Sequence, residues 1–376
     1  MLAHSPPLPL TVDYRSEDDI TAGDEEGLSL ALEQRRRVRH LRLVLPVQNL
    51  QKLVIAVDEG FPILEYLIMG PPPKDEDKTT LMLPETLQAP RLRHIMLGGF
   101  AFPILHPTAA GLVTLYLIID HQSAYFQPNV LLHWISFMPR LESLAILFTF
   151  PVPNCDVTNS PITTNMTLSN LRLFRFQGVS AYLEAVVCRI TAPRLEDLEI
   201  RLFKQLTFSF PHLAQFMNTI ENLRFDNAMV MFKNEEIYVG MFSREDDTYP
   251  IVVTVDCWHL DWQVSSAVQI SNGLSQVFSA VKHLTLVHEL HSHSSEEHND
   301  VDWIEWRDLL RSFSNVKTLR VEDGLVEQLS RCLRLEDGKL PLKLLPKLQE
   351  LTYWNPQIPV MHSPHSSVPA RTQATL

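Results

Sequence analysis

Short apolar runs with one recurring spacing appear along the whole chain: an apolar residue is followed three and five positions later by two more. The clearest copy is Leu195/Leu198/Ile200, preceded by Pro193. The last two positions alternate with polar residues, as in a strand with one buried face, and the first lies in the turn leading into that strand. Further copies follow at about 20 to 35 residue intervals, in or beyond the range of leucine-rich repeats. They are Val38/Leu41/Leu43, Leu64/Leu67/Met69, Leu92/Ile95/Leu97, Leu112/Leu115/Leu117, Leu141/Leu144/Ile146, Leu171/Phe174/Phe176, Ile220/Leu223/Phe225, Val281/Leu284/Leu286, Val316/Leu319/Val321 and Leu348/Leu351/Tyr353, with a weaker copy at Val252/Val255/Cys257.

Segments between these strands have helical spacing. Residues 129–137, 180–190, 302–313 and 325–333 place apolar side chains three and four positions apart, and Ser180 is a suitable N-cap. Strand followed by helix, repeated, implies right-handed crossovers and a parallel sheet covered by helices on one side. The pattern therefore predicts an α/β fold: a leucine-rich-repeat-like solenoid with a curved parallel sheet, helices on its outer side and irregular repeats.

The two ends differ from the repeats. Residues 1–27 are Pro-rich and then acidic, which predicts a flexible segment, although 10–14 could form an edge strand. Residues 28–354 hold the repeats, and no linker divides them. Residues 355–376 combine several prolines with Ser and His, which predicts a disordered C-terminal tail.

Composition narrows the function. The formal charge of −12 argues against a nucleic-acid partner, because neutralising phosphates requires an excess of Lys and Arg. The four cysteines are isolated, and no phosphate loop, nucleophile elbow or dinucleotide motif occurs, so we expect no enzyme and no cofactor. Without a secretory signal or an apolar run long enough to span a bilayer, we expect no membrane partner and a cytoplasmic or nuclear location.

Five phrases give the chain a family resemblance: SPPLPL at 5–10, QAPRLRH at 88–94, FRFQGVSAYL at 174–183, LDWQV at 260–264 and EWRDLLRSFSNVKTLRV at 305–321. With them, most of residues 5–354 resembles the leucine-rich-repeat portion of the F-box proteins of mushroom-type fungi. The resemblance implies a substrate receptor of a cullin-based ubiquitin ligase, in which the repeats present the target and the F-box grips a Skp-type adaptor.

The chain departs from that family at its start. The family's F-box opens with a Leu-Pro-x-Glu phrase and a helical run, and neither precedes Ser5. We therefore expect no Skp-type adaptor as a partner and carry over no adaptor-binding residue. Either the gene model is truncated, or the protein binds targets without delivering them to a ligase. A degenerate family copy without activity is a further alternative.

One histidine-rich segment suggests metal chemistry. His288, His291, His293 and His298 lie among three glutamates, and imidazole and carboxylate groups could hold a divalent metal for a hydrolase. The zinc-protease motif needs His-Glu-x-x-His, whereas this chain has His-Glu-x-His, so both histidines cannot lie one helical turn apart. A solvated loop is the alternative, and we expect no metal site.

An aromatic and polar cluster is the candidate protein interface. Trp258, His259, Asp261 and Trp262 follow a predicted strand, and Trp dominates the energetic centres of interfaces. The alternative is packing between neighbouring repeats. The sequence thus predicts a non-enzymatic protein-interaction module whose protein target it does not identify.

Overall fold

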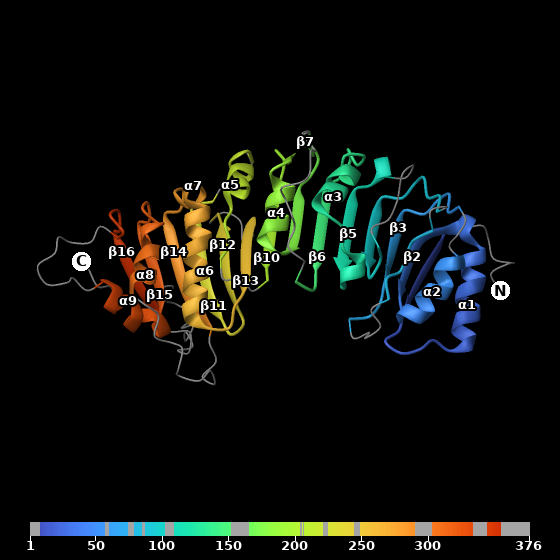
Figure 1. The fold of residues 1–376 in the computed structure, drawn as a ribbon, viewed down its shortest axis with the longest axis horizontal. Coiled ribbons are helices and arrows are strands. Elements are labelled where there is room, and N and C mark those ends of the chain that lie inside the picture. The colour runs from blue at the N-terminus through green and yellow to red at the C-terminus, as the bar shows by residue number, and fades with distance from the viewer. Residues whose placement is uncertain are drawn as a thin grey trace, which may run out of the picture. The chain divides into compact units, whose positions relative to one another are not determined.

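The structure is a computed structural model and describes residues 8–56, 60–73, 79–84, 87–101, 109–151, 165–203, 205, 207–220, 225–243, 249–289, 303–333 and 344–354. Its internal contacts divide the chain into two compact units, Met1–Leu195 (unit 1) and Glu196–Leu376 (unit 2). Both combine open, mostly parallel sheets with helices (Figure 1), so the predicted α/β class is confirmed. The boundary between the units falls inside a repeat phrase, directly after Leu195.

Unit 1 contains a sheet whose neighbouring strands are all parallel. In spatial order its strands are β1 (Leu10–Arg15), β2 (Val38–Val44), β3 (Tyr66–Gly70), β4 (His94–Gly98), β5 (Thr114–Ile119), β6 (Ser143–Phe148) and β8 (Leu173–Gly178). A separate pair is formed by β7 (Met166–Thr167) and β9 (Ile190–Thr191). The helices are α1 (Ala22–Glu33), α2 (Val47–Ala56), α3 (Pro128–Ile135) and α4 (Ser180–Val187), with short 3-10 helices η2 (Arg35–Arg37), η3 (Ala109–Gly111) and η4 (Gln122–Ala124).

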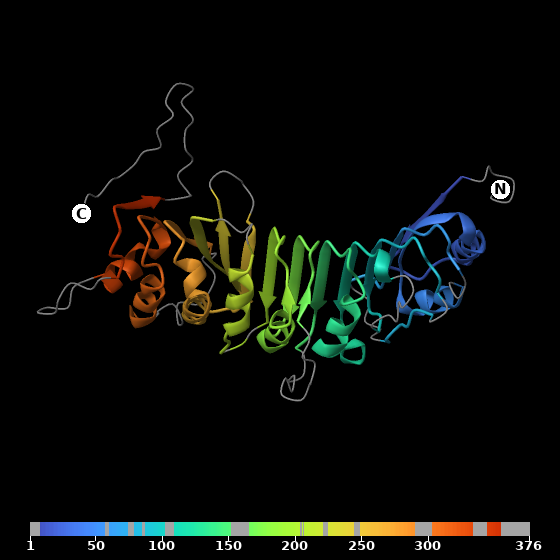
Figure 2. The same cartoon turned by 90° about the horizontal axis from the view of Figure 1, so that it is seen from above.

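The repeat spacing explains the core of unit 1. Leu67, Ile95, Leu115 and Leu144 occupy the same motif position and lie in register on adjacent strands, and each is at most 1% exposed. The first apolar position of each copy is buried in the turn before its strand, as at Leu92 and the equivalent residues Leu64, Leu112, Leu141 and Leu171. Helices α2, α3 and α4 lie on one side of these strands (Figure 2). The opposite side of the sheet is therefore without a helix in the described part of unit 1.

The N-terminal segment is more ordered than predicted. The possible edge strand is present as β1, which pairs in parallel with β2. Helix α1 begins at Ala22, inside the segment expected to be flexible. The hydroxyl of Thr21 accepts the backbone N–H of Asp24, and Asp24 and Glu25 lie in the first turn. Acidic side chains there stabilise the helix dipole, so the acidic composition supports a helix instead of disorder.

Unit 2 contains a sheet that is not wholly parallel. Its strands in spatial order are β10 (Asp197–Leu202), β13 (Ile251–Asp256), β12 (Glu236–Phe242), β11 (Asn227–Lys233), β14 (His283–Glu289), β15 (Thr318–Glu322) and β16 (Glu350–Trp354). Strand β12 is antiparallel to both β11 and β13, and the other pairs are parallel. The expectation of a purely parallel sheet is wrong here, because only two residues connect β11 to β12, too few for a crossover.

The repeat copy predicted at Ile220/Leu223/Phe225 lies mostly outside the described residues. The strand that the structure describes after it begins at Asn227 and buries Ala228, Val230 and Phe232. The weak copy at Val252/Val255/Cys257 has the wrong first position. Strand β13 already runs through Val252, whose side chain lies on the opposite face from Val253 and Val255.

The helices of unit 2 are α5 (Pro211–Asn218), α6 (Leu260–Gly273), α7 (Ser275–Phe278), α8 (Trp303–Arg311) and α9 (Val326–Leu333), with 3-10 helix η7 (Asp323–Leu325). Of these, α8 and α9 match the predicted segments 302–313 and 325–333, whereas α5, α6 and α7 were not predicted. In unit 1, α3 and α4 match 129–137 and 180–190, but Ser180 is the first helical residue and Val179 takes the cap position. Among the helices of the described residues, none has the length and apolar character needed to cross a membrane.

Candidate functional site

The helix-free face of unit 1 carries a row of aromatic side chains at the beginning of the strands. His40, Tyr66, His94 and Thr114 lie side by side in register on β2 to β5. The Tyr66 ring stacks on His94 at 4.1 Å with an interplanar angle of 7°, and His40 meets Tyr66 edge-on at 4.6 Å. His94 Nδ1 lies 3.0 Å from the Thr114 hydroxyl oxygen. Tyr66 remains 38% exposed, so the row offers an aromatic surface to a partner.

A second row on the same face is apolar at its centre. Ile68, Met96 and Tyr116 are half-buried neighbours in register, and Arg42 and Arg175 stand at the two ends of this row. The solvent face of a sheet ordinarily carries polar side chains at such positions. A contiguous apolar patch bordered by charge is a mark of an interaction site.

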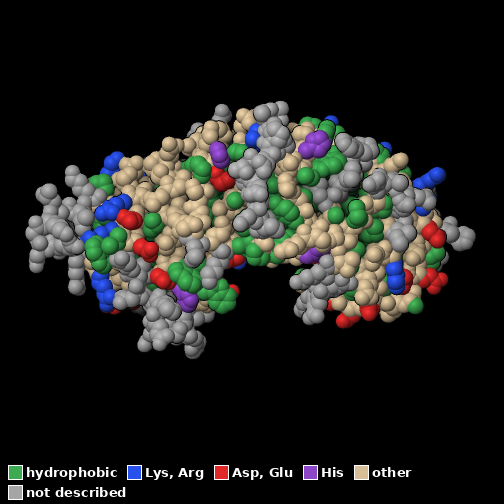
Figure 3. Space-filling view, viewed as in Figure 1, with side chains coloured by type: hydrophobic (Ala, Val, Ile, Leu, Met, Phe, Trp, Pro, Cys, Tyr) green, Lys and Arg blue, Asp and Glu red, His purple; other side chains and the backbone are tan. Residues whose placement is uncertain are grey.

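Helix α3 also exposes apolar side chains, on the other side of unit 1. Hydrophobic groups show over α3 in Figure 3. Val130 of α3 is 37% exposed, and Phe137, two residues after the helix ends, is 38% exposed with its ring against His133. These are two exposed apolar side chains, whereas the strands align two whole rows in register. The in-register face of the strands is therefore the stronger candidate.

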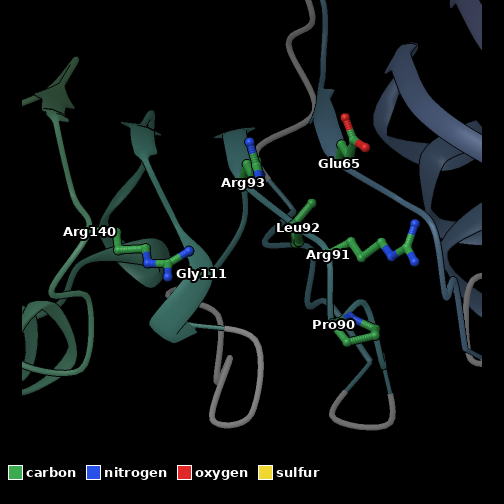
Figure 4. Close-up of a pocket in the computed structure, with 7 residues that line it drawn as sticks. All are labelled: Glu65, Pro90, Arg91, Leu92, Arg93, Gly111 and Arg140. Atoms are coloured by element: carbon green, nitrogen blue, oxygen red, sulfur yellow. The ribbon is translucent and has the colours of Figure 1, made fainter.

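Next to the aromatic row, at the edge where the strands begin, lies a pocket of about 320 Å³. Three arginines, Arg91, Arg93 and Arg140, line it together with Glu65, and Pro90, Leu92 and Gly111 complete its wall (Figure 4). Arg93 and Glu65 directly precede His94 and Tyr66 of the aromatic row. A volume of this size falls at the lower end of ligand-binding pockets.

The repeat pattern explains why a pocket forms at this place. Arg91, Gly111 and Arg140 occupy the same position in three successive copies, each just before a buried leucine. Gly111 has no side chain, so a gap remains between the two arginine-bearing turns. A Cβ at Gly111 would lie 3.3 Å from the carbonyl oxygen of Leu92, which makes even a small side chain tight there. The pocket thus forms where one side chain is missing from an otherwise regular stack of turns.

Charged residues alternate in sign at the position that directly follows the first buried apolar residue of each copy. Backbone hydrogen bonds from each turn to the one before connect Arg39, Glu65, Arg93, Val113, Glu142 and Arg172 in that order. Arg39 Nη2 lies 2.9 Å from Glu65 Oε2, and this hydrogen bond lowers the pKa of the Glu65 carboxyl. Val113 interrupts the alternation immediately after Arg93.

The interruption leaves the pocket with an excess of positive charge. Glu65 is already paired with Arg39, and Val113 supplies no carboxylate. Within the part of the chain that the structure describes, the side chains of Arg91, Arg93 and Arg140 form no ion pair and no hydrogen bond. Burial and the adjacent Arg93 lower the pKa of His94, so its imidazole is neutral near pH 7 and adds no charge.

The predicted interface residues lie in unit 2, where β13 leads into α6. Trp258 is 61% and Trp262 36% exposed, and the His259 ring meets Trp262 edge-on at 4.7 Å. Asp261 accepts the backbone N–H of Trp262 through its side chain at 2.8 Å. Trp258 is therefore not part of the core, whereas Leu260, two residues later, is buried. The structure therefore brings His259 and Trp262 together and leaves Trp258 at the surface.

A small cavity adjoins this cluster. It measures about 70 Å³ and is lined by Trp262, Asp256 and Cys257, together with Gln205, Ser265, Ser266 and Gln269. Two or three water molecules would fill it. Burial raises the pKa of the Cys257 thiol to about 11, so it is protonated at neutral pH and is not a nucleophile.

The open face of the unit 2 sheet, opposite the side chains that the strands bury, carries a network of ion pairs. Arg201 Nη2 lies 2.9 Å from Asp256 Oδ1 and 3.1 Å from Glu236 Oε2, and Lys233 Nζ lies 3.1 Å from Glu236 Oε1. The network spans β10, β13, β12 and β11. It contrasts with the pocket of unit 1, where three cations share one carboxylate that is already engaged.

The histidine-rich segment is mostly outside the described residues, including His291, His293 and His298. His288, at the end of β14, is half-buried, and its backbone N–H donates to Glu322 Oε2. Among the residues that the structure describes, no group of three or more His, Cys, Asp or Glu side chains could hold a metal ion.

Sequence reasoning missed the pocket and the aromatic row. A signal was present in the repeated Pro-Arg-Leu phrase, which occurs at Pro90, Pro139 and Pro193. Aligning the copies would have shown arginine, glycine and arginine at one position of neighbouring turns. Comparison with models of known protein families finds no match for the chain, and comparison with curated proteins finds none either.

Proposed function

We propose that this chain is a non-enzymatic protein-interaction module, a leucine-rich-repeat-like solenoid that binds a protein target on the helix-free face of unit 1. The observation that carries the proposal is the pair of in-register rows, one aromatic (His40, Tyr66, His94) and one apolar (Ile68, Met96, Tyr116). Aromatic and methionine side chains are enriched in interface centres, and Arg42 and Arg175 would form part of a charged rim.

The resemblance to fungal F-box repeats gives this proposal a biological setting. In that family the repeats recognise substrates for ubiquitin ligation, and a face of exposed strand residues suits that task. The Trp258 and Trp262 cluster of unit 2 is a second surface for protein contact, supported by its exposure.

Affinity capture followed by quantitative mass spectrometry tests the proposal. The tagged full chain is compared with Met96→Glu, which places a charge in the apolar row, and with Met229→Glu as the matched control. Met229 is a half-buried residue on the open face of unit 2. We expect Met96→Glu to reduce recovery of specific partners at least about tenfold, since burying an unpaired carboxylate costs more than 1.4 kcal/mol.

The control variant is expected to recover the same partners as the parent chain. Circular dichroism must show that both variants are folded. If a folded Met96→Glu chain retains every partner of the parent at equal yield, the helix-free face of unit 1 is not the recognition surface.

A further inference from the structure

We infer that the arginine pocket of unit 1 binds an extended acidic segment of a partner protein, with aspartate or glutamate carboxylates seated between Arg93 and Arg140. This inference deepens the proposed function and rests on it. Val113 separates Arg93 from the next charged residue of the row, Glu142, so Arg93 has no carboxylate beside it on the side of Gly111. A partner carboxylate at this turn would lie within reach of Arg93 and Arg140, the two pocket arginines on either side of Gly111.

The spread of the arginines favours a segment over a single small anion. In Figure 4 the Arg140 side chain reaches from its turn toward Gly111, whereas Arg91 extends away from Gly111 on the other side of Arg93. Guanidinium groups that converge would clamp one phosphate, whereas separated ones suit several carboxylates along a chain.

The surroundings favour a peptide over a nucleic acid. The chain carries a formal charge of −12, and a nucleic-acid surface needs a continuous excess of cations. The adjoining row of Tyr66, His94 and His40 provides a place for an apolar or aromatic residue of the same segment. Carboxylates in the pocket and a ring on the row would fix both the position and the direction of the bound chain.

Fluorescence anisotropy with synthetic peptides tests this inference on the full chain. The probe is a fluorescein-labelled peptide, Gly-Glu-Glu-Tyr-Glu-Glu-Gly, and its counterpart carries Gln in place of every Glu. At about 50 mM salt, where screening of the charges is weak, we expect the acidic peptide to bind at least about tenfold more tightly. Arg93→Gln and Arg140→Gln are each expected to weaken its binding about tenfold, because each removes one charge-assisted contact.

Arg194→Gln is the matched control. Arg194 follows Pro193 as Arg140 follows Pro139, is exposed, and does not line the pocket. It is expected to bind the acidic peptide as the parent does. Val113→Glu is expected to abolish binding, because its own carboxylate would occupy Arg93 while the arginines stay in place.

Several outcomes would overturn the inference. One is no binding of the acidic peptide by the folded parent chain at millimolar concentration, and another is an equal loss in Arg194→Gln and Arg140→Gln. A third is tighter binding of a phosphoserine peptide or an oligouridine RNA through the same arginines. If the acidic peptide fails while Met96→Glu still loses captured partners, only the acidic segment is wrong and the proposed face stands.

Discussion

Two glycines of unit 1 are required for different physical reasons. Gly111 matters because its missing side chain opens the pocket. Gly99, which follows β4, matters for its backbone: its φ is +68°, and an added Cβ would lie 3.2 Å from both Asp120 Oδ2 and Pro71 Cδ. The Gly98-Gly99 pair therefore makes the turn that closes this strand.

Replacing Gly99 by alanine is expected to lower the free energy of unfolding by about 1–3 kcal/mol, because a positive φ is unfavourable for alanine and its Cβ would make close contacts. Gly27→Ala, inside helix α1, is the control, because no atom lies within 4 Å of its added Cβ. It is expected to raise stability by about 0.5–1 kcal/mol, the ordinary gain from glycine to alanine in a helix. Urea unfolding measures both. Equal effects of the two substitutions would contradict the backbone argument.

At the scale of elements, the sequence predicted most parallel strands because each copy buries its own apolar positions. Leu115 and Leu144, for example, are fully buried and lie opposite each other on adjacent strands, so the apolar pattern of each copy was enough to predict them. The β11–β12 hairpin was missed because its strands alternate without the leading apolar turn residue of the repeat. The site was missed for another reason. It depends on the missing side chain at Gly111 and on the missing charge at Val113, and the pattern of apolar positions indicates neither.

The cross-strand charge network of unit 2 makes a pH-dependent prediction. Burial raises the pKa of the Asp256 carboxyl, and Arg201 opposes that rise. Arg201→Gln should therefore move the pKa of Asp256 further upward in the folded state. An acid whose folded pKa exceeds its unfolded pKa destabilises the fold when it is ionised, and this cost disappears as the pH falls through the folded pKa.

We accordingly expect Arg201→Gln to be less stable than the parent at pH 7, with the difference narrowing toward acidic pH. Urea unfolding across that range and carbon-detected titration of Asp256 by nuclear magnetic resonance provide the measurements. Arg15→Gln is the control, because Arg15 and its partner Asp13 are 54% and 46% exposed. Its effect should be small, as for other surface ion pairs. A pKa of Asp256 unchanged by Arg201→Gln would refute the coupling.

At the scale of the whole molecule, each unit holds a core of its own. Unit 1 is built on the in-register column of Leu67, Ile95, Leu115 and Leu144, and unit 2 on residues such as Ile200, Val253 and Val230. Both units leave one sheet face without a helix in their described parts, but they use it differently. Unit 1 presents rings, apolar groups and unpaired arginines, whereas unit 2 presents ion pairs that are already closed.

Leu115→Ala tests the core column of unit 1. Leu115 is fully buried, and its truncation is expected to cost about 2–5 kcal/mol of unfolding free energy, including the cavity that it leaves. Hydrogen exchange should accelerate first in β5 itself and in the flanking strands β4 and β6. Thr352→Ala, at a half-buried position on β16, serves as the comparison and should change stability little. A cost below about 1 kcal/mol for Leu115→Ala would contradict the assigned core.

At Gly111 and Val113, the residues that determine ligand recognition differ from the leucines that form the core. Leu112 between these two positions is fully buried, whereas Val113 is only half-buried. Exchanging Val113 for a charged residue would change which ligand charge the pocket prefers while the buried leucines stay in place, whereas Gly111 is restricted by the backbone oxygen 3.3 Å from its added Cβ. Specificity in such a chain would then be free to diverge rapidly, one turn at a time, on an unchanged scaffold.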